Sequence, residues 1–444
     1  PQGRGPGGWG IDVLLNTLGW SGLTLLRPYD IIAATCRGGI YLRLFPTTEA
    51  IMLSEDTLHH LLHRGVAEIV GEDELIGWLR SGRKLRLKQG FDPSKPNLHV
   101  GHAVGLRKLR QFQGLGHQVI LIVGDWTAQI GDPSGRDESR QRLSLDEVKR
   151  NAQTYMEQFF RIVDERKTEV RWQSEWYGRF SLADVFELTA RFTLADMMAH
   201  ETFRLRWENR QPLSLMELMY PLLQGYDSVA IDSDVEFGGT DQKFNILVGR
   251  QLQGMMGMRP QAVFLVPLLA GTDGRKMSKS FGNTVDVIDP PAEMYGKLMR
   301  MSDDVLPDYF ATLTDVPDAE LVNMQLDMQL GKLNPRDAKM RLARQVVALF
   351  HGQIAAAEAE SAFVKVFQKR ELPSDMATVI IAPGASAVDF LVASGLASSK
   401  SEARRLIRQG GVSVNGERLS DGAAPATPGI WRVGTRRFVR AVTG

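Results

Sequence analysis

A short apolar run, Gln118–Val123 (QVILIV), constrains the fold of this chain more than any other feature. A near-continuous apolar run of strand length predicts a strand that is buried on both faces, as in a parallel sheet covered by helices. The polar, Gly-rich segment Gly124–Arg136 (GDWTAQIGDPSGR) follows at once. Because open parallel sheets bind ligands beyond the carboxyl ends of their strands, we expect a ligand site there.

Strand-like runs alternate with helical periodicity through the first two thirds of the chain. This alternation predicts an α/β fold with a doubly wound, Rossmann-like parallel sheet. We expect strands over 85–88, 118–123, 170–173, 234–237 and 262–269. We expect helices over 52–70 (with Leu58, Leu61, Leu62, Val66 and Ile69 on one stripe), 74–80, 100–115, 145–163, 181–192, 194–201 and 214–228.

The pattern becomes wholly helical after Asn283, with a long last helix expected over 335–370. A basic helix, a Gly-Gly stop and a hairpin turned by Asn415-Gly416 then predict a small α+β unit. We therefore expect five parts: a non-native or disordered leader before a natural start at Met52, a catalytic domain, an α-helical domain, a linker and the α+β domain. Their expected bounds are 1–51, 52–285, 286–370, 371–384 and 385–444.

Composition excludes several classes of protein. The 53 basic and 52 acidic residues balance, so any contact with nucleic acid must come from a local patch. Cys36 is the only cysteine, which excludes an internal disulfide and a cysteine-rich zinc site and favours the cytoplasm. No run approaches the roughly 20 apolar residues of a membrane span. We expect neither a membrane nor DNA as a partner.

Two motifs indicate phosphate chemistry. His99-Val100-Gly101-His102 follows a predicted strand and opens a predicted helix, where free N–H groups and the helix dipole attract anions. Gly101 would let a ligand approach the backbone. Far along the chain, Lys276–Ser280 (KMSKS) places two lysines in a Gly-rich loop, and such point charges suit a leaving phosphate. Taken singly, the first motif could be a histidine helix cap and the second a solvated loop.

The two motifs in this order resemble the signatures of class I aminoacyl-tRNA synthetases. The likeness extends over about residues 55 to 444 to the bacterial tyrosyl-tRNA synthetases with a C-terminal S4-type RNA-binding domain. It is carried by GFDPSKPNLHVGH, GDWTAQIGDPSGR, YPLLQGYDS, GGTDQKFN and DGRKMSKSFGN. The resemblance implies activation of L-tyrosine with ATP, release of pyrophosphate and transfer of tyrosine to tRNA(Tyr).

The resemblance also implies roles for the phosphate residues. Catalytic contacts to ATP and pyrophosphate are expected from His99, His102, Lys276, Lys279, Arg136 and Arg140. Further contacts to ATP are expected from Asp92, Gly101, Asp241, Ser278 and Ser280. No protein nucleophile is required, since positioning and charge stabilisation supply most of the effect. Mg²⁺ would arrive with ATP, with no dedicated metal site and no tightly bound cofactor.

The implied tyrosine site includes one departure from the family. Tyrosine contacts are expected from Thr127, Asp132, Tyr220, Gln224, Asp227, Gln242 and Lys88. Asp227 matches the residue that accepts the phenol hydrogen bond. Lys88 stands where many relatives have a tyrosine that helps bind the phenol, and Gln89 where many have a cysteine. We expect Lys88 to point into the site and pair with Asp227, although it could instead donate to the phenol or turn away.

The last sixty residues carry a net charge of about +5, from nine basic and four acidic residues. We expect RNA contacts from Lys400, Arg404, Arg405 and Arg408 on one helix face. By resemblance, a homodimer is expected. The alternatives are a tryptophanyl-tRNA synthetase, which shares the fold and similar signatures, and a non-catalytic, synthetase-like RNA-binding protein.

Overall fold

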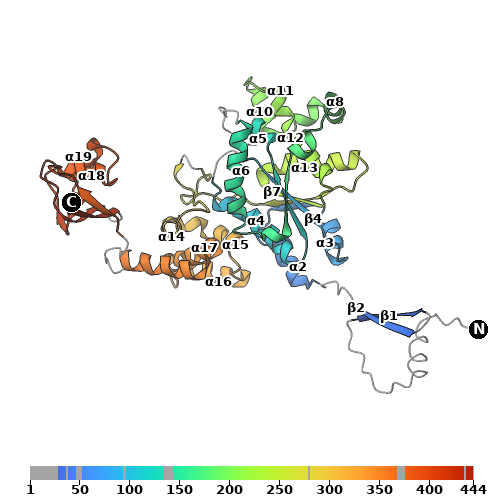
Figure 1. Cartoon of the computed structure of the whole chain (residues 1–444), viewed down its shortest axis with the longest axis horizontal. Coiled ribbons are helices and arrows are strands. Elements are labelled where there is room, and N and C mark those ends of the chain that lie inside the picture. Colours follow the sequence, from blue (N-terminus) through green and yellow to red (C-terminus); the bar gives the residue numbers. More distant parts are fainter. Residues whose placement is uncertain are drawn as a thin grey trace, which may run out of the picture.

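A six-stranded sheet lies at the centre of the main body of the chain, with helices on both faces (Figure 1). The computed structural model describes residues 29–36, 39–46, 53–93, 97–134, 144–278, 281–367, 376–434 and 437–443. The sheet contains β3 (Glu68–Val70), β4 (Arg86–Phe91), β5 (Gln118–Val123), β6 (Thr168–Trp172), β7 (Val235–Gly239) and β8 (Ala262–Val266).

The strand order is β3-β8-β7-β4-β5-β6. Every neighbouring pair is parallel except β3 with β8, which is antiparallel. The chain enters the parallel part at β4, moves outward through β5 to β6, and then crosses to β7 and β8 on the other side. The order therefore reverses between β4 and β7, which is where doubly wound sheets bind ligands. The predicted doubly wound sheet is confirmed, and the antiparallel edge strand adds to it.

The helices of this body cover the sheet and extend beyond it. They are α2 (Glu55–His63), α3 (Glu72–Arg80), α4 (Val100–Gly114), α5 (Thr127–Ile130), α6 (Leu145–Phe159), η1 (Glu165–Lys167), α7 (Ser174–Tyr177), α8 (Leu182–Thr189), α9 (Leu194–Met197), α10 (Glu201–Glu208), α11 (Leu215–Leu218), α12 (Tyr220–Ala230), η2 (Thr240–Gln242) and α13 (Lys243–Met255).

The helix expected over 52–70 is wrong in its second half. α2 ends at His63, and Gly65 adopts a left-handed backbone with φ of 63°, which stops the helix. Ile69 and Val70 then pair with Phe264 and Val263 of β8. Their branched and apolar side chains suit a strand as well as a helix stripe, and the pairing decides between the two.

The helical region after the sheet shares its core with the sheet. It consists of α14 (Pro291–Met299), η4 (Asp303–Val305), α15 (Leu306–Leu313), α16 (Asp318–Gln329) and α17 (Pro335–Phe367). Leu62 and Leu106 belong to the same buried cluster as Tyr309 and Phe310. α17 is not the single straight helix expected, because Gly352 has φ of 86° and ψ of 167° and divides it in two.

The C-terminal unit has a hydrophobic core of its own, which includes Phe390 and Trp431. Its sheet has the order β11-β10-β12-β13-β9, so the expected α+β character is confirmed. The elements are β9 (Thr378–Ile381), α18 (Ala387–Ala393), α19 (Lys400–Arg408), β10 (Val412–Val414), β11 (Glu417–Arg418), β12 (Gly429–Val433) and β13 (Arg437–Thr443).

Two further strands lie within the expected leader. β1 (Tyr29–Cys36) and β2 (Gly39–Pro46) pair antiparallel in a sheet of their own, so a hairpin occurs in a segment that we expected to have no fold. Across the described ranges, no helix is both long and apolar enough to span a membrane.

The crossing of α12 and α13 yields a test of packing. A Cβ on Gly225 of α12 would lie 3.1 Å from the backbone nitrogen of Gly249 on α13, so this glycine permits the close approach of the two helices. We expect Gly225→Val to lower the free energy of unfolding, measured in urea, by about 1–3 kcal/mol through overpacking.

The matched control is Gly77→Val on α3, because a Cβ at Gly77 meets nothing within 4 Å. This variant should change the free energy of unfolding by less than about 0.5 kcal/mol. Equal losses in the two variants would contradict the packing account.

Candidate active site

The predicted site residues converge at the carboxyl ends of the strands beside the switch point. Asp92 follows β4 directly, Thr127 opens α5 after β5, and Asp241 and Gln242 form η2 after β7. α12 carries Tyr220, Gln224 and Asp227 at its first, fifth and eighth positions. Tyr220 bonds to Asp92, directly after β4, and Asp227 bonds to Gln173, directly after β6. Residues that lie up to 150 positions apart in the chain therefore form one site.

The two phosphate motifs meet although about 175 residues separate them. The N–H of Val100 donates to the carbonyl of Val285 over 2.9 Å, and the N–H of Val287 donates to the carbonyl of Leu98 over 2.9 Å. Met277, inside KMSKS, is buried and lies beside Gly101. These contacts place the start of the KMSKS loop next to the start of α4.

The side chain of Asn283 holds the KMSKS loop through three hydrogen bonds. Its Oδ1 accepts from the N–H of Ser278 over 2.8 Å, and its Nδ2 donates to Asp273 over 2.8 Å and to the carbonyl of Lys276 over 3.1 Å. Lys276 is exposed. Four residues that were expected to contact phosphate, Lys279, Ser280, Arg136 and Arg140, lie outside the described residues.

The two histidines of the first motif cap α4. His99 is the N-cap residue, and its N–H donates to Nδ1 of His102 over 3.3 Å. The two rings lie 4.0 Å apart between centroids. A Cβ on Gly101 would lie 2.9 Å from Nδ1 of His99, so glycine leaves room for that ring. The two histidines cap the helix, and the ring of His102 stays exposed. The same arrangement therefore allows an imidazole to contact a ligand.

Asp92 joins the residues that were expected to bind the amino acid. Its carboxylate accepts from Tyr220 Oη over 3.0 Å and from Thr127 Oγ1 over 2.6 Å. Gly124 makes this contact possible, because a Cβ there would collide with both Asp92 and Thr127. Burial, followed by the Asp92 carboxylate, raises the pKa of Tyr220 well above its ordinary value, so its hydroxyl stays neutral and donates.

Asp227 is buried in a cage of donors. Its carboxylate accepts from Gln173 Nε2 over 2.8 Å and from Trp176 Nε1 over 3.1 Å. The hydroxyl of Tyr177 lies 3.4 Å away and donates to the nearer carbonyl of Leu223. Burial raises the pKa of Asp227 from 3.8 to about 7, while Lys88 and the donated hydrogen bonds oppose the shift. At neutral pH this carboxyl group is thus poised between its two protonation states.

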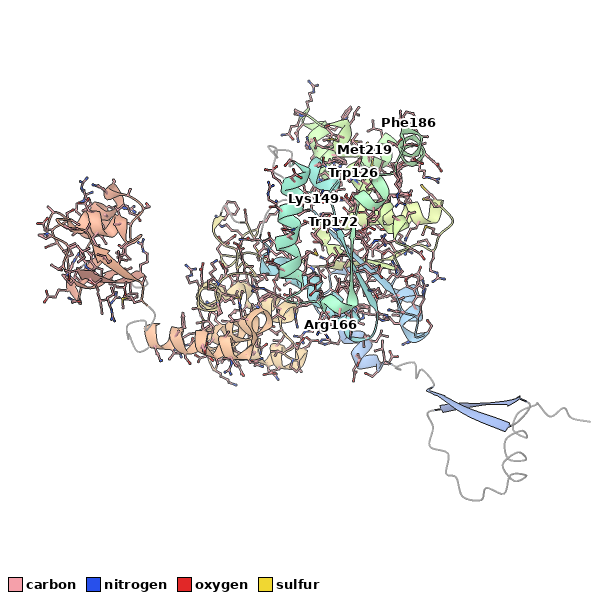
Figure 2. All side chains as sticks on the ribbon, in the orientation of Figure 1. Trp126, Lys149, Arg166, Trp172, Phe186 and Met219 are labelled. Atoms are coloured by element: carbon pink, nitrogen blue, oxygen red, sulfur yellow. The ribbon has the colours of Figure 1, made fainter. Side chains whose placement is uncertain are left out.

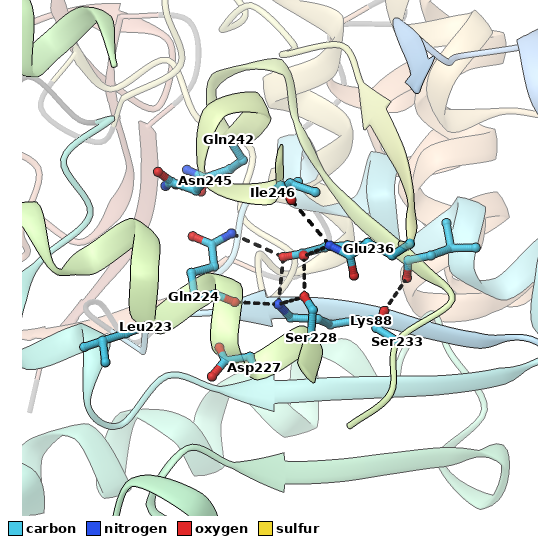
Figure 3. Close-up of polar contacts among 12 residues, drawn as sticks. Lys88, Leu223, Gln224, Asp227, Ser228, Ser233, Glu236, Gln242, Asn245 and Ile246 are labelled. Atoms are coloured by element: carbon cyan, nitrogen blue, oxygen red, sulfur yellow. Dashed lines mark hydrogen bonds and ion pairs between the residues drawn. The ribbon is translucent and has the colours of Figure 1, made fainter. Parts of the chain in front are cut away.

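The predicted pairing of Lys88 with Asp227 is wrong. Among the described residues, the ion pair of Lys88 is with Glu236, over 2.9 Å, and no hydrogen bond or ion pair joins it to Asp227. Figure 3 shows the carboxylate of Asp227 outside the network around Lys88. The reason is register, since Lys88 and Glu236 are direct neighbours across the parallel strands β4 and β7.

A second polar group lies around Gln242. Its Nε2 donates to Asp132 over 2.6 Å and to Ser134 over 2.9 Å, and its Oε1 accepts from Asn245 over 3.2 Å. Burial first, and the Asp132 carboxylate second, raise the pKa of Asp241, whereas Lys276 opposes the shift. The charges of Asp132 and Lys276 are therefore close enough to Asp241 to change its pKa.

Several partners of the site were missed from the sequence. Gln173 follows β6 and bonds to both Thr127 and Asp227, while Trp176 and Tyr177 lie on the short helix after it. Position at the carboxyl end of a predicted strand was a usable signal for Gln173. Glu236 had no such signal, because a carboxylate inside a strand looks solvent-facing until its neighbour is known.

The basic side chains of α19 in the C-terminal unit face outward, as predicted. Ala403 and Ile407 of α19 are buried, while Lys400, Arg404, Arg405 and Arg408 are exposed. Lys400 is paired with Asp389 over 2.8 Å, so the three arginines carry most of the accessible charge. Within the described ranges, no group of three or more His, Cys, Asp or Glu side chains is placed to hold a metal ion.

Comparison with protein families gives two matches. Residues 80–368 match the model for class I tRNA synthetases of the tryptophan and tyrosine type. Residues 388–429 match the S4 domain. The first match covers most of the sheet and the helical region, and the second lies within the C-terminal unit.

Curated relatives match nearly end to end. The chain is 53% identical over 393 residues to the tyrosine–tRNA ligase of Dehalococcoides mccartyi strain CBDB1, covering 88% of this chain and 99% of the relative. It is 49% identical to the tyrosine–tRNA ligase of Thermotoga maritima, covering 86% of this chain and 97% of that protein. These relatives therefore match this chain over nearly their whole length.

Solved structures share the fold. A C-terminally truncated mitochondrial tyrosyl-tRNA synthetase of Aspergillus nidulans has a TM-score of 0.60 at 23% identity, covering 72% of this chain and 97% of that one. The tryptophanyl-tRNA synthetase of Aeropyrum pernix has a TM-score of 0.52 at 20% identity, covering 69% and 87%. The fold alone therefore does not separate tyrosine from tryptophan, whereas the closer sequence relatives carry the tyrosine name.

The raised pKa of Asp227 predicts a pH dependence of stability. Between about pH 4 and 7 the folded protein holds a proton on this carboxyl group that the unfolded chain releases, so stability falls as the pH rises through this window. Relative to Asp227→Asn, the wild-type free energy of unfolding should fall by up to about 1.4 kcal/mol per pH unit, most steeply near pH 5–6 and about half as steeply at pH 7. Denaturant titrations at several pH values check this. Parallel curves for the two proteins would contradict it.

Proposed function

Because the chain belongs to the tyrosine–tRNA ligases, a family of class I aminoacyl-tRNA synthetases, we propose how its residues divide the reaction. The established part is the activity itself, the ATP-dependent attachment of tyrosine to tRNA, together with an S4 RNA-binding domain. The roles of single residues, the dimer and the domain limits at 52–285, 286–370, 371–384 and 385–444 are our proposal.

The observation that supports the proposal most is the meeting of the two phosphate motifs beside a donor–acceptor network. The backbone bonds from Val100 to Val285 and from Val287 to Leu98 join the motifs. Asp92, seven residues before His99 in the chain, accepts a hydrogen bond from Tyr220 of α12. An ATP phosphate chain at the start of α4 would thus lie next to an amino acid held by Tyr220 and Asp92.

We assign the amino-acid half to the network around α12. The α-ammonium group of tyrosine would be bound by Tyr220, Gln224, Thr127 and Asp132, since a carboxylate and neutral oxygens suit a cation. Gln242, oriented by its bond to Asp132, would contact the substrate carboxylate. The phenol would donate to Asp227 in its ionised form.

We assign the ATP half to the start of α4 and the KMSKS loop. His99, His102 and the backbone at Gly101 would bind phosphate or ribose, and Asp241 the ribose, with Asp92 beside them and Ser278 in the loop. Lys276 would stabilise the charge that grows on pyrophosphate. Lys279, Ser280, Arg136 and Arg140 keep their expected roles in the proposal. Mg²⁺ would enter with ATP and screen its phosphates.

The reaction needs no covalent enzyme intermediate. A tyrosine carboxylate oxygen attacks the α-phosphorus of ATP, the bond to the bridging oxygen breaks, and pyrophosphate leaves with its charge. The terminal ribose hydroxyl of the tRNA then attacks the carbonyl carbon and AMP leaves. We propose that Arg404, Arg405 and Arg408, with Lys400, hold the tRNA backbone during this second step. A cytoplasmic location belongs to the same proposal.

Tyrosine-dependent ATP–pyrophosphate exchange, run beside tryptophan and phenylalanine, tests the assignments. Tyrosine should support exchange, and phenylalanine should be rejected by roughly 10⁴–10⁵ because it leaves Asp227 without its donor. Asp227→Ala should lower kcat/KM for tyrosine by about 100-fold or more and leave that for phenylalanine nearly unchanged. Lys276→Ala is the complementary variant, which should lower kcat with little change in the KM for tyrosine.

Other outcomes separate the alternatives. Exchange with tryptophan would overturn the assignment of Asp227 as the phenol acceptor. Absence of exchange with all three amino acids would favour the non-catalytic RNA-binding alternative. Loss of tyrosine and phenylalanine activity by equal factors in Asp227→Ala would show that this residue supports the fold rather than selects the substrate.

We also propose where two copies of the chain meet. Large apolar side chains are exposed on α8 to α11 and at the end of α13, and Figure 1 shows α8, α10 and α11 together at one end of the body. Phe186 lies at this end (Figure 2). Exposed apolar side chains gathered at one end of a protein mark interaction surfaces. They are Leu182, Phe186, Leu194, Leu205, Trp207, Leu215, Met255 and Met256. Since the family resemblance implies a homodimer, the occupant that we propose is a second copy of this chain.

Replacing apolar residues of this surface by charge should break the dimer. Phe186, 63% exposed in the single chain, should be buried between two copies, so Leu182→Glu/Phe186→Glu should convert the dimer to a monomer in sedimentation velocity. Leu326→Glu is the control, since Leu326 on α16 is similarly exposed, at 51%, and lies outside this surface. A dimer that survives the double change, or a control that dissociates, would contradict the assignment.

A further inference from the structure

A buried ion pair lies at the switch point, beneath the proposed tyrosine site. Lys88 on β4 and Glu236 on β7 are 0% and 1% exposed, and their charged groups lie 2.9 Å apart. Strand order reverses between these two strands, and Lys88 bonds there to Gln224 and Ser228 of α12. Burying two charges costs several kcal/mol per ion unless hydrogen bonds satisfy them fully.

The ammonium group of Lys88 has no donor left for a substrate. An ammonium has three N–H groups, and three acceptors surround it: Glu236 Oε1, the carbonyl of Gln224 over 2.8 Å and Ser228 Oγ over 2.8 Å. Within the described chain, the neighbours of Lys88 therefore account for its whole hydrogen-bonding capacity. A direct bond from Lys88 to the tyrosine phenol would require breaking one of these three.

The carboxylate of Glu236 is equally satisfied. Oε1 accepts from Lys88 and, over 3.3 Å, from Gln224 Nε2. Oε2 accepts from Ser228 Oγ over 2.9 Å and from Gln261 Nε2 over 2.6 Å. Four donors match the four lone-pair positions of a carboxylate. Figure 3 shows these contacts converging on the one carboxylate.

Two of these partners attach the pair to the substrate-binding helix. Gln224 and Ser228 lie on α12 on either side of Asp227, and both bond to Lys88 and Glu236. Asp227 itself accepts hydrogen bonds from Gln173 and Trp176 instead. The helix is thus held to the sheet through the residues that flank Asp227, which determines the direction in which the Asp227 carboxylate points.

We propose that the Lys88–Glu236 ion pair is a positioning unit that sets the specificity for tyrosine, by holding α12 so that Gln224 and Asp227 meet the substrate without either member of the pair contacting it. This inference rests on the proposed roles of Gln224 and Asp227. It also explains how the chain does without the tyrosine usual at position 88, because phenol recognition then rests on the oriented carboxylate of Asp227.

The two charges also act on Asp227 in opposite senses. After burial, which raises the pKa of Asp227, Lys88 lowers it and Glu236 raises it. The other titratable groups that face Asp227 are Tyr177 and Tyr220, and burial raises the pKa of both well above the ordinary value, so they stay neutral near pH 7. Loss of Lys88 should therefore raise the pKa of Asp227, and loss of Glu236 should lower it. A loss of packing alone would not shift this pKa in opposite directions in the two variants.

The test compares Lys88→Met, Glu236→Gln and the double variant in tyrosine-dependent exchange. Each single variant leaves one buried charge unpaired and should raise the KM for tyrosine about tenfold or more, while the KM for ATP stays within about twofold. The acid limb of kcat/KM for tyrosine should move to higher pH in Lys88→Met and to lower pH in Glu236→Gln. The double variant, which buries no charge, should recover most of the tyrosine KM and place the limb near that of the wild type.

Lys297→Met is the matched control, because Lys297 pairs with Asp289 over 2.7 Å on α14, away from α12. It should leave the KM for tyrosine unchanged. Thermal unfolding of every variant identifies any that fail to fold. If one single variant does not fold, the neutral double variant can still be compared with the wild type.

Three outcomes would overturn the inference: equal rises in KM for tyrosine and ATP, limbs that shift in the same direction, or a double variant no better than the worse single. These failures differ from failure of the proposed function. If the wild type shows no tyrosine-dependent exchange, or Asp227→Ala leaves selectivity intact, the roles of the site residues are wrong. If Asp227→Ala loses selectivity but the Lys88 and Glu236 variants behave as the wild type does, only the positioning role fails.

Discussion

The reversal of strand order between β4 and β7 is the constraint on which the site depends. At such a point two neighbouring strands continue to opposite sides of the sheet, and their following loops separate. Asp92 follows β4 and Asp241 lies in η2 after β7, and Tyr220 of α12 donates a hydrogen bond to Asp92. The topology of one sheet brings them together.

Buried polar groups, rather than apolar packing, give the site its detailed geometry. Asp227 accepts from the side chains of Gln173 and Trp176, and the Lys88–Glu236 pair is satisfied on every side. In a low-dielectric interior, such networks stabilise one arrangement strongly because any displacement leaves a polar group unpaired.

Much of the fold was predictable from local pattern. The parallel strands were expected near their observed positions, and Gln118–Val123 was predicted with its observed ends, because a strand buried on both faces is apolar throughout. The errors occurred where local pattern is ambiguous. Ile69 and Val70 fit a helix stripe as well as an edge strand, and only pairing with β8 decides. A single glycine such as Gly352 does not by itself predict a break in a long Ala-rich helix, and only its backbone angles show one.

The sequence by itself determined the family and the chemistry, because phosphate-binding motifs and the spacing Tyr220–Gln224–Asp227 are local properties that survive without coordinates. It also drew attention to Lys88. Only the tertiary structure decided which residue pairs with Lys88, since the partner of a buried charge depends on strand register. Glu236 is 148 positions away in the chain yet directly opposite on the neighbouring strand. No pattern within either strand contains that information, and it appears only when β4 and β7 lie side by side.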